Sequence, residues 1–152
     1  MVRFPAIALL MIAPLFAQAP EPKDDPYVLG VAQISAGNYE KAKTYMERAV
    51  KEDPKNAKSW VRLGIVRGKL GDSEGRYAAY RRAIQIDPGY AEAHYNLGFA
   101  YLLDGDRCAA TAEADKLAGL DAELSRKLDM LIALIIFDPF GSVCVVGQSV
   151  VI

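Results

Sequence analysis

A Leu-Gly pair recurs in this chain at a constant interval of 34 residues, as Leu29-Gly30, Leu63-Gly64 and Leu97-Gly98. A second glycine follows each pair at a fixed distance, and an Asp-Pro pair closes two of the units, at Asp53-Pro54 and Asp87-Pro88. Fixed periods of roughly 20–50 residues are typical of arrays in which a short unit buries its apolar face only by stacking on the next. The sequence therefore predicts three repeats, over 23–56, 57–90 and 91–124.

Each repeat has the pattern of two helices joined by a short turn. The second glycines, Gly37, Gly71 and Gly105, suit the left-handed conformation that ends a helix, and the Asn38, Asp72 and Asp106 that follow them suit a helix cap. Pro54 and Pro88 end the second helices, because proline lacks the amide hydrogen that a helix interior donates. The expected fold class is all-α, a helical-repeat solenoid of three helix-turn-helix pairs.

The positions of these residues resemble those of the tetratricopeptide repeat family. The second repeat carries the signature most fully, with Trp60, Leu63, Gly64, Gly71, Tyr80, Ala83 and Pro88. The third repeat departs from it, because Ala114 replaces a large aromatic residue and Ala122 a proline. Arg76 stands in the second repeat where alanine is usual. The resemblance implies an array that presents a surface to other proteins and performs no catalysis.

In that family the first helix of each pair forms a concave face, along which extended or helical peptides bind. The resemblance therefore implies that the partner-binding groove contains Tyr27, Val31, Ile34, Lys58, Val61, Arg62, Ile65, Lys69, Glu92, Tyr95, Asn96, Phe99 and Leu102. For Val31, Ile65 and Leu102, packing against a neighbouring helix is an equally good interpretation. Two of the positions at which some members bind the acidic tails of heat-shock chaperones are here apolar, and Glu92 occupies a third, so chaperone-tail binding is not expected.

The two ends of the chain have compositions of their own. Residues 1–19 combine Arg3, an apolar run over 6–13 and Ala17-Gln18-Ala19, the three parts of a secretory signal peptide, although an uncleaved N-terminal anchor remains open. A helix over 121–137 is expected to cap the array. The apolar tail over 138–152 could dock on a partner or pair with itself. These features predict an exported protein, either periplasmic or secreted.

Residues with catalytic or metal-binding potential are sparse. His94 holds the position of Trp60 in the next repeat, which favours a ring packed between helices over a catalytic or ligand role. Cys108 and Cys144 have no metal-site spacing, so the favoured interpretation is two unpaired thiols, with a disulfide in an oxidising compartment as the alternative. The sequence predicts neither an enzyme, a cofactor nor a metal site.

Charge is balanced over the whole chain but uneven between repeats. The formal net charge of -1 gives no general attraction to nucleic acid or anionic lipid. The second repeat has seven basic and three acidic residues, and the third has two and seven. Such a dipolar module could associate with itself, although attraction between adjacent repeats explains the pattern as well. The predicted function is a protein–protein interaction adaptor, with a structural component of a cell-envelope assembly, held by its apolar termini, as the alternative.

Overall fold

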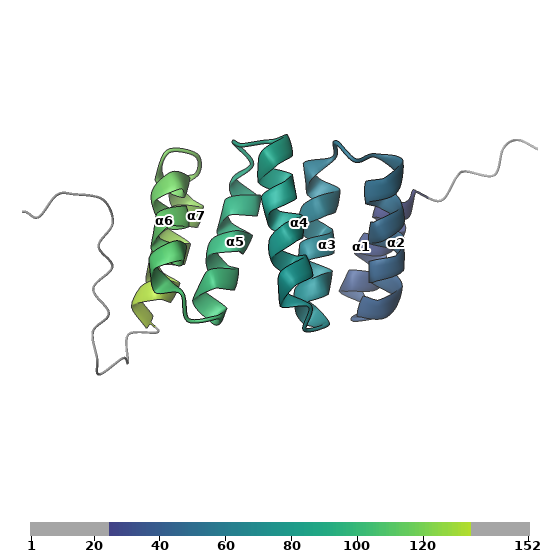
Figure 1. Ribbon diagram of the computed structural model, residues 1–152, viewed down its shortest axis with the longest axis horizontal. Coiled ribbons are helices and arrows are strands. Elements are labelled where there is room, and N and C mark those ends of the chain that lie inside the picture. The colour runs from purple at the N-terminus through teal and green to yellow at the C-terminus, as the bar shows by residue number, and fades with distance from the viewer. Residues whose placement is uncertain (1–24, 135–152) are drawn as a thin grey trace, which may run out of the picture.

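The computed structural model describes residues 25–134, and in this part of the chain it contains seven helices and no strand. They are α1 (Pro26–Ser35), α2 (Tyr39–Glu52), α3 (Ala57–Lys69), α4 (Ser73–Ile86), α5 (Ala91–Leu103), α6 (Arg107–Ala118) and α7 (Ala122–Leu134). Helices α1 and α2, α3 and α4, and α5 and α6 form three pairs that stack side by side along one axis (Figure 1). The predicted all-α repeat solenoid is confirmed. The expected segments 1–19 and 138–152 lie outside the described residues.

The turns inside the pairs form as the sequence predicts, with one exception. Gly37, Gly71 and Gly105 have φ angles of 74°, 81° and 84°, a region that L side chains rarely adopt. The Asp72 and Asp106 carboxylates cap the following helices by accepting from the amides of Gly75 and Ala109, at 2.8 and 2.9 Å. The prediction of a side-chain cap at Asn38 is wrong, because its amide donates to Gln33 across the turn instead.

Close approach of paired helices explains the recurring Leu-Gly glycines. A Cβ atom added to Gly64 would collide with the Tyr80 ring of α4, and one added to Gly30 would lie 2.6 Å from the Met46 methyl of α2. At Gly98 it would lie 2.5 Å from Leu128 of α7. Small residues at these three positions therefore let a large side chain of a second helix fill the space, and each repeat gains a core contact.

Helix α7 closes the C-terminal end of the array. Helix α6 ends at Ala118, and Asp121 starts the next helix by accepting from the amides of Glu123 and Leu124. Leu128 is fully buried in a cluster with Leu117 of α6. The expected capping helix is present through Leu134, and residues 135–137 lie outside the described part.

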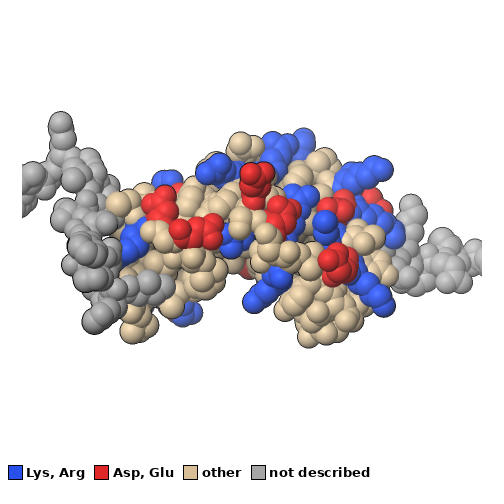
Figure 2. Space-filling view, turned by 60° about the horizontal axis from the view of Figure 1, so that its bottom comes forward, with Lys and Arg blue, Asp and Glu red and all other residues tan. Residues whose placement is uncertain are grey.

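Ion pairs join the basic second repeat to the acidic third. Arg62 on α3 pairs with Glu92 on α5 at 3.2 Å, and Arg76 on α4 pairs with Asp104, directly after α5, at 2.7 Å. In Figure 2 a row of acidic side chains lies on the left of the face in view, and most basic side chains lie to its right. The opposite charges of the second and third repeats thus form ion pairs between these two repeats.

Two further expectations concern single residues. Cys108, near the start of α6, is disulfide-bonded, so the expectation of an unpaired thiol is wrong at this position, while Cys144 lies outside the described residues. His94 is buried between helices as predicted, with 5 % of its surface exposed. Between Asp25 and Leu134, no helix has both the length and the apolar composition needed to cross a membrane.

Candidate functional site

Helices α1, α3 and α5 are the first helices of the three repeats, and each contacts the next. They carry the residues predicted to form the groove. Lys58 and Lys69 are exposed, and the other polar or aromatic positions are half-buried, namely Tyr27, Arg62, Glu92, Tyr95, Asn96 and Phe99. Val31 and Ile34 are half-buried too and pack against the core of the first repeat.

Two of the predicted groove residues are core residues instead. Val61 has none of its surface exposed and packs in a cluster with Tyr80 and Leu97. Leu102 is 3 % exposed. Each lies on the side of its helix that faces a packed neighbour, so neither side chain reaches a partner. The prediction is therefore wrong for Val61, and for Leu102 the alternative of helix packing holds.

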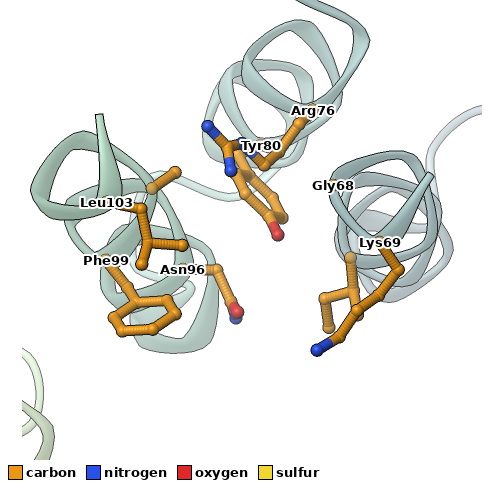
Figure 3. A pocket seen from close by; sticks show the side chains of 9 residues that line it. Gly68, Lys69, Arg76, Tyr80, Asn96, Phe99 and Leu103 are labelled. Carbon is orange, nitrogen blue, oxygen red and sulfur yellow. The ribbon is translucent and has the colours of Figure 1, made fainter. Parts of the chain in front are cut away.

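An open pocket of about 280 Å³ lies between α3, α4 and α5. Figure 3 shows Lys69 and Asn96 on opposite sides of its mouth, with Phe99 and Leu103 on the α5 side. Ile65, Lys69, Asn96 and Phe99 were expected in the groove, and the structure brings them together here. The lining residues that the sequence analysis missed are Gly68, Arg76, Tyr80, Ala100 and Leu103.

Arg76 reaches this pocket from the second helix of its pair. Gly68 makes room for it, because a Cβ at that position would lie 2.8 Å from the Arg76 Cδ. The guanidinium donates to Asp104 at 2.7 Å, and the Tyr77 hydroxyl donates to the same oxygen at 2.6 Å. The hydrogen bonds from Tyr77 and Arg76 hold the pKa of Asp104 below its ordinary value. The Nε of Arg76 is buried and has no hydrogen-bond partner among the described residues. The only indication in the sequence that Arg76 has a special role was that it stands where alanine is usual in the family.

Tyr80 supplies a hydroxyl to the back of the pocket. Its ring fills the space above Gly64, while its oxygen points between α3 and α5 (Figure 3). Burial raises the pKa of Tyr80 to about 12, so the hydroxyl is protonated at neutral pH and can donate. No hydrogen bond of this hydroxyl is formed within the described part of the chain. The sequence analysis named Tyr80 only as a signature position of the family and did not anticipate a hydroxyl open to the groove.

In the other half of the groove, toward the N-terminal ends of α3 and α5, the half-buried polar side chains pair with one another, while Lys58 is exposed and makes no ion pair with a described residue. Glu92 accepts from Arg62, and from the Tyr90 hydroxyl at 2.6 Å. Burial and this hydrogen bond raise the pKa of Tyr90. Burial alone would lower the pKa of Arg62, but the Tyr27 hydroxyl and the Glu92 carboxylate together raise it. The four side chains join all three repeats.

A second, more apolar pocket of about 230 Å³ lies between α5 and α7. Tyr95 lines it together with Lys127 and the exposed side chains of Met130 and Leu134. The Tyr95 ring stacks on Phe99 with 6.5 Å between centroids. Tyr95 therefore belongs to the C-terminal edge of the groove and links it to the capping helix.

Within residues 25–134, no group of three or more His, Cys, Asp or Glu side chains is placed to hold a metal ion. The two nitrogens of His94 face the Glu113 carboxylate at 2.6 Å and the Pro88 carbonyl at 3.0 Å. The Trp60 indole donates in the same way to the carbonyl of Pro54, one repeat earlier. His94 thus keeps a contact that the repeats share and adds a link between α5 and α6.

Family models agree with the repeats that the structure shows. Residues 27–56 and 57–90 each match a model described as tetratricopeptide repeat, and residues 77–105 match one described as TPR repeat. The peroxisomal targeting signal receptor of Komagataella phaffii is 32% identical over 93 residues, which are 60% of this chain and 16% of the receptor. The chain thus spans less than a fifth of that relative.

Solved structures with the same fold include two complexes. The Yersinia enterocolitica type III secretion chaperone SycD, bound to a peptide of the translocator YopD, has a TM-score of 0.67 at 19% identity and covers 72% of this chain and 88% of its own. The TPR2B domain of yeast Sti1, in complex with pHsp70, has a TM-score of 0.67 at 19% identity. The match covers 71% of this chain and 90% of the TPR2B chain. At such identities the likeness shows the fold alone.

Proposed function

Because the chain belongs to the tetratricopeptide repeat family, we propose that it is a non-catalytic adaptor that binds a segment of another protein along α1, α3 and α5. The observation that carries the proposal is the open pocket between α3, α4 and α5, in which apolar side chains and hydrogen-bond donors lie together. Pockets of this composition suit peptide recognition, because apolar anchors supply affinity and a few polar groups supply orientation. SycD, which has the same fold, was solved with a bound peptide, and this supports the proposal.

The mechanism of such an adaptor is passive. Packed helices hold the groove side chains in place before the partner arrives, so the complex loses less conformational entropy when it forms. The pairing of Arg62 with Glu92 and Tyr27 contributes to this rigidity, because it ties the three first helices together. The chain needs no cofactor for this role.

Selection of random 12-residue peptides displayed on phage, with the full chain as bait, tests the proposal. We expect enrichment of peptides that contain apolar residues and that lose binding to a Leu103→Arg variant, because Leu103 lines the pocket with 58 % of its surface exposed. Leu120→Arg is the matched control, since Leu120 is exposed between α6 and α7. No enrichment, or equal binding to wild type and the Leu103→Arg variant, would contradict the proposal.

Export is the second part of the proposal, and the composition of residues 1–19 supports it. The mass of the protein purified from an exported fraction should correspond to loss of a segment ending near Ala17 or Ala19. A full-length mass in a cytosolic fraction would contradict export. The alternative of an envelope component held by its apolar termini depends on residues outside the described part, and no described feature favours it.

A further inference from the structure

The pocket between α3, α4 and α5 combines an apolar wall with positive charge. Ile65, Phe99 and Leu103 form the wall, while Lys69 and Arg76 are the two cationic lining residues. No carboxylate lines the pocket. Lys69 is exposed at the mouth and makes no ion pair with any described residue. The charge of this half of the groove is therefore matched by a negative group rather than by a second cation.

Two donors of the residues that line the pocket have no hydrogen-bond partner among the described residues. More than nine-tenths of the Arg76 surface is buried, and Asp104 satisfies its Nη2 but leaves its Nε without a partner. The Tyr80 hydroxyl at the back of the pocket also lacks a partner in residues 25–134. The buried Nε of Arg76 is away from water, which is unfavourable until an acceptor reaches it. The Tyr80 hydroxyl, by contrast, is open to the pocket and can donate to an oxygen acceptor that enters it.

The acidic groups nearest to the pocket are already engaged. Glu92 is held by Arg62 and Tyr90 at the other end of the groove. Asp104 is held by Arg76 and Tyr77 beyond the edge of the pocket. Neither carboxylate is free to pair with Lys69. The acceptor that completes the site therefore comes with the ligand.

Resting on the proposed function, we infer that this pocket selects a partner segment in which an aliphatic side chain stands one or two residues from an aspartate or glutamate. The aliphatic side chain packs between Ile65, Phe99 and Leu103, and the carboxylate accepts from Lys69 and Tyr80. Figure 3 shows why the two requirements are adjacent, because the Lys69 amine and the Tyr80 hydroxyl face the same opening as Phe99 and Leu103.

Matched peptides test the inference. A 12-residue peptide taken from the phage selection is synthesised in three forms, with Glu, Gln or Lys two positions from its leucine, and is titrated with the full chain by fluorescence anisotropy. We expect the Glu form to bind about tenfold more tightly than the Gln form, since a charge-assisted hydrogen bond is lost, and the Lys form to bind most weakly. Equal affinity of the three forms would overturn the inference and leave the proposed function standing, whereas no selected peptide at all would overturn both.

Two variants of residues that line the pocket locate the preference. Tyr80→Phe keeps the ring above Gly64 and removes only the hydroxyl, so it should weaken the Glu form about threefold to fivefold and the Gln form less, because a neutral amide oxygen is the weaker acceptor. Lys69→Glu should reverse the order of the Glu and Lys forms. Lys51→Glu is the matched control, because Lys51 is an exposed lysine of α2, a second helix of its pair, and lies outside the pocket. An unchanged order of affinities in the Lys69→Glu variant overturns the inference.

A competing occupant is the chain's own segment over 135–152, in which Asp138 is the single acidic residue and stands among apolar ones. The full-length Asp138→Asn variant separates the two cases. We expect it to bind the Glu peptide with wild-type affinity. A clear gain in affinity would assign the pocket to this segment and overturn the inference of a partner peptide.

Discussion

The two halves of the groove both include α3 and α5 but differ in how their half-buried polar groups are satisfied. In the half toward the N-terminal ends of α3 and α5, Arg62, Glu92, Tyr90 and Tyr27 satisfy one another. In the half toward the C-terminal ends, Lys69 makes no ion pair and the Tyr80 hydroxyl makes no hydrogen bond with a described residue. A groove can therefore hold its repeats together at one end and remain open for a ligand at the other.

This difference changes how charged groove residues should be interpreted. Arg62 and Lys69 both lie on α3, and both were expected to face a partner. Arg62 is held by groups from the other two repeats, so its charge contributes mainly to the stability of the array. The charge of Lys69 is available for recognition. Position on a concave face alone does not distinguish these two roles.

The largest expected effect comes from a substitution that separates α3 from α4 and so disrupts both halves of the groove. Gly64→Leu forces a side chain into the Tyr80 ring, so the pair of α3 and α4 must separate. We expect the free energy of unfolding to fall by about 3 kcal/mol, with loss of peptide binding. Urea denaturation measures it, and Gly89→Ala is the control, because a Cβ there would meet only Asp87 at 3.5 Å. If the Gly64→Leu variant were as stable as wild type, α3 and α4 would not pack as closely at Gly64 and Tyr80 as the structure shows.

The open half should respond in binding and hardly at all in stability. Leu103→Asp introduces a charge on the apolar wall, and we expect the affinity for a selected peptide to fall about thirtyfold, as for an anchor residue at an interface. The free energy of unfolding should change by no more than about 0.5 kcal/mol, since the side chain is exposed. Val28→Asp is a matched control, because Val28 is 59 % exposed against 58 % for Leu103. Equal losses of affinity in the Leu103→Asp and Val28→Asp variants would show that the pocket contributes no more to binding than another exposed apolar position.

The contact between Arg76 and Asp104 forms the boundary of the open half, and its strength should depend on pH. Asp104→Asn should lower the free energy of unfolding by about 1 kcal/mol at pH 7, because the buried guanidinium loses its charged acceptor while solvent screens the carboxylate, which is 40 % exposed. The lowered pKa of Asp104 means that its stabilising contribution is complete above the unfolded-state pKa and is lost as pH falls through the folded-state pKa.

Wild type and the Asp104→Asn variant should therefore converge in acid. Urea denaturation between pH 7 and pH 3 checks this, with Asp115→Asn, an exposed carboxylate of α6, as the control. If the difference in the free energy of unfolding between wild type and Asp104→Asn stayed constant from pH 7 to pH 3, the charge of Asp104 would not be the source of its stabilising effect.

The paired half should show the smallest effect. A double-mutant cycle of Arg62→Ala and Glu92→Ala should give a coupling energy of about 0.5 kcal/mol, because both side chains are about one-third exposed. High salt should reduce this coupling. Affinity for a peptide in the open half should remain within about twofold of wild type in both single variants. A large loss of affinity in Arg62→Ala would place the ligand at this end of the groove.

Repeat spacing was sufficient to predict the helix pairs and their turns, and the family resemblance implied which helices line the groove. The residues that were missed depend on how helices rotate against each other. Val61 and Arg62 are neighbours in the chain, and only the packing of α3 against α4 and α5 decides that Val61 is buried. A period of 34 residues carries no information on that rotation.

Arg76 illustrates a second limit. Its long side chain reaches the pocket because Gly68 on the facing helix leaves room, and this pairing of an unusual arginine with a glycine is visible only in three dimensions. Tyr80 is similar, because its ring belongs to the core while its hydroxyl belongs to the groove. Family positions identify the ring and say nothing of the oxygen.

Nuclear magnetic resonance titration of the full, isotopically labelled chain with a selected Glu-bearing peptide tests the central claim most directly. We predict that the largest shifts of backbone amides fall in residues 65–69 and 96–103, around the open half, and that they shrink in the Lys69→Glu variant. Shifts concentrated in α2, α4 and α6 away from the pocket, or around Arg62 and Glu92, would contradict the account.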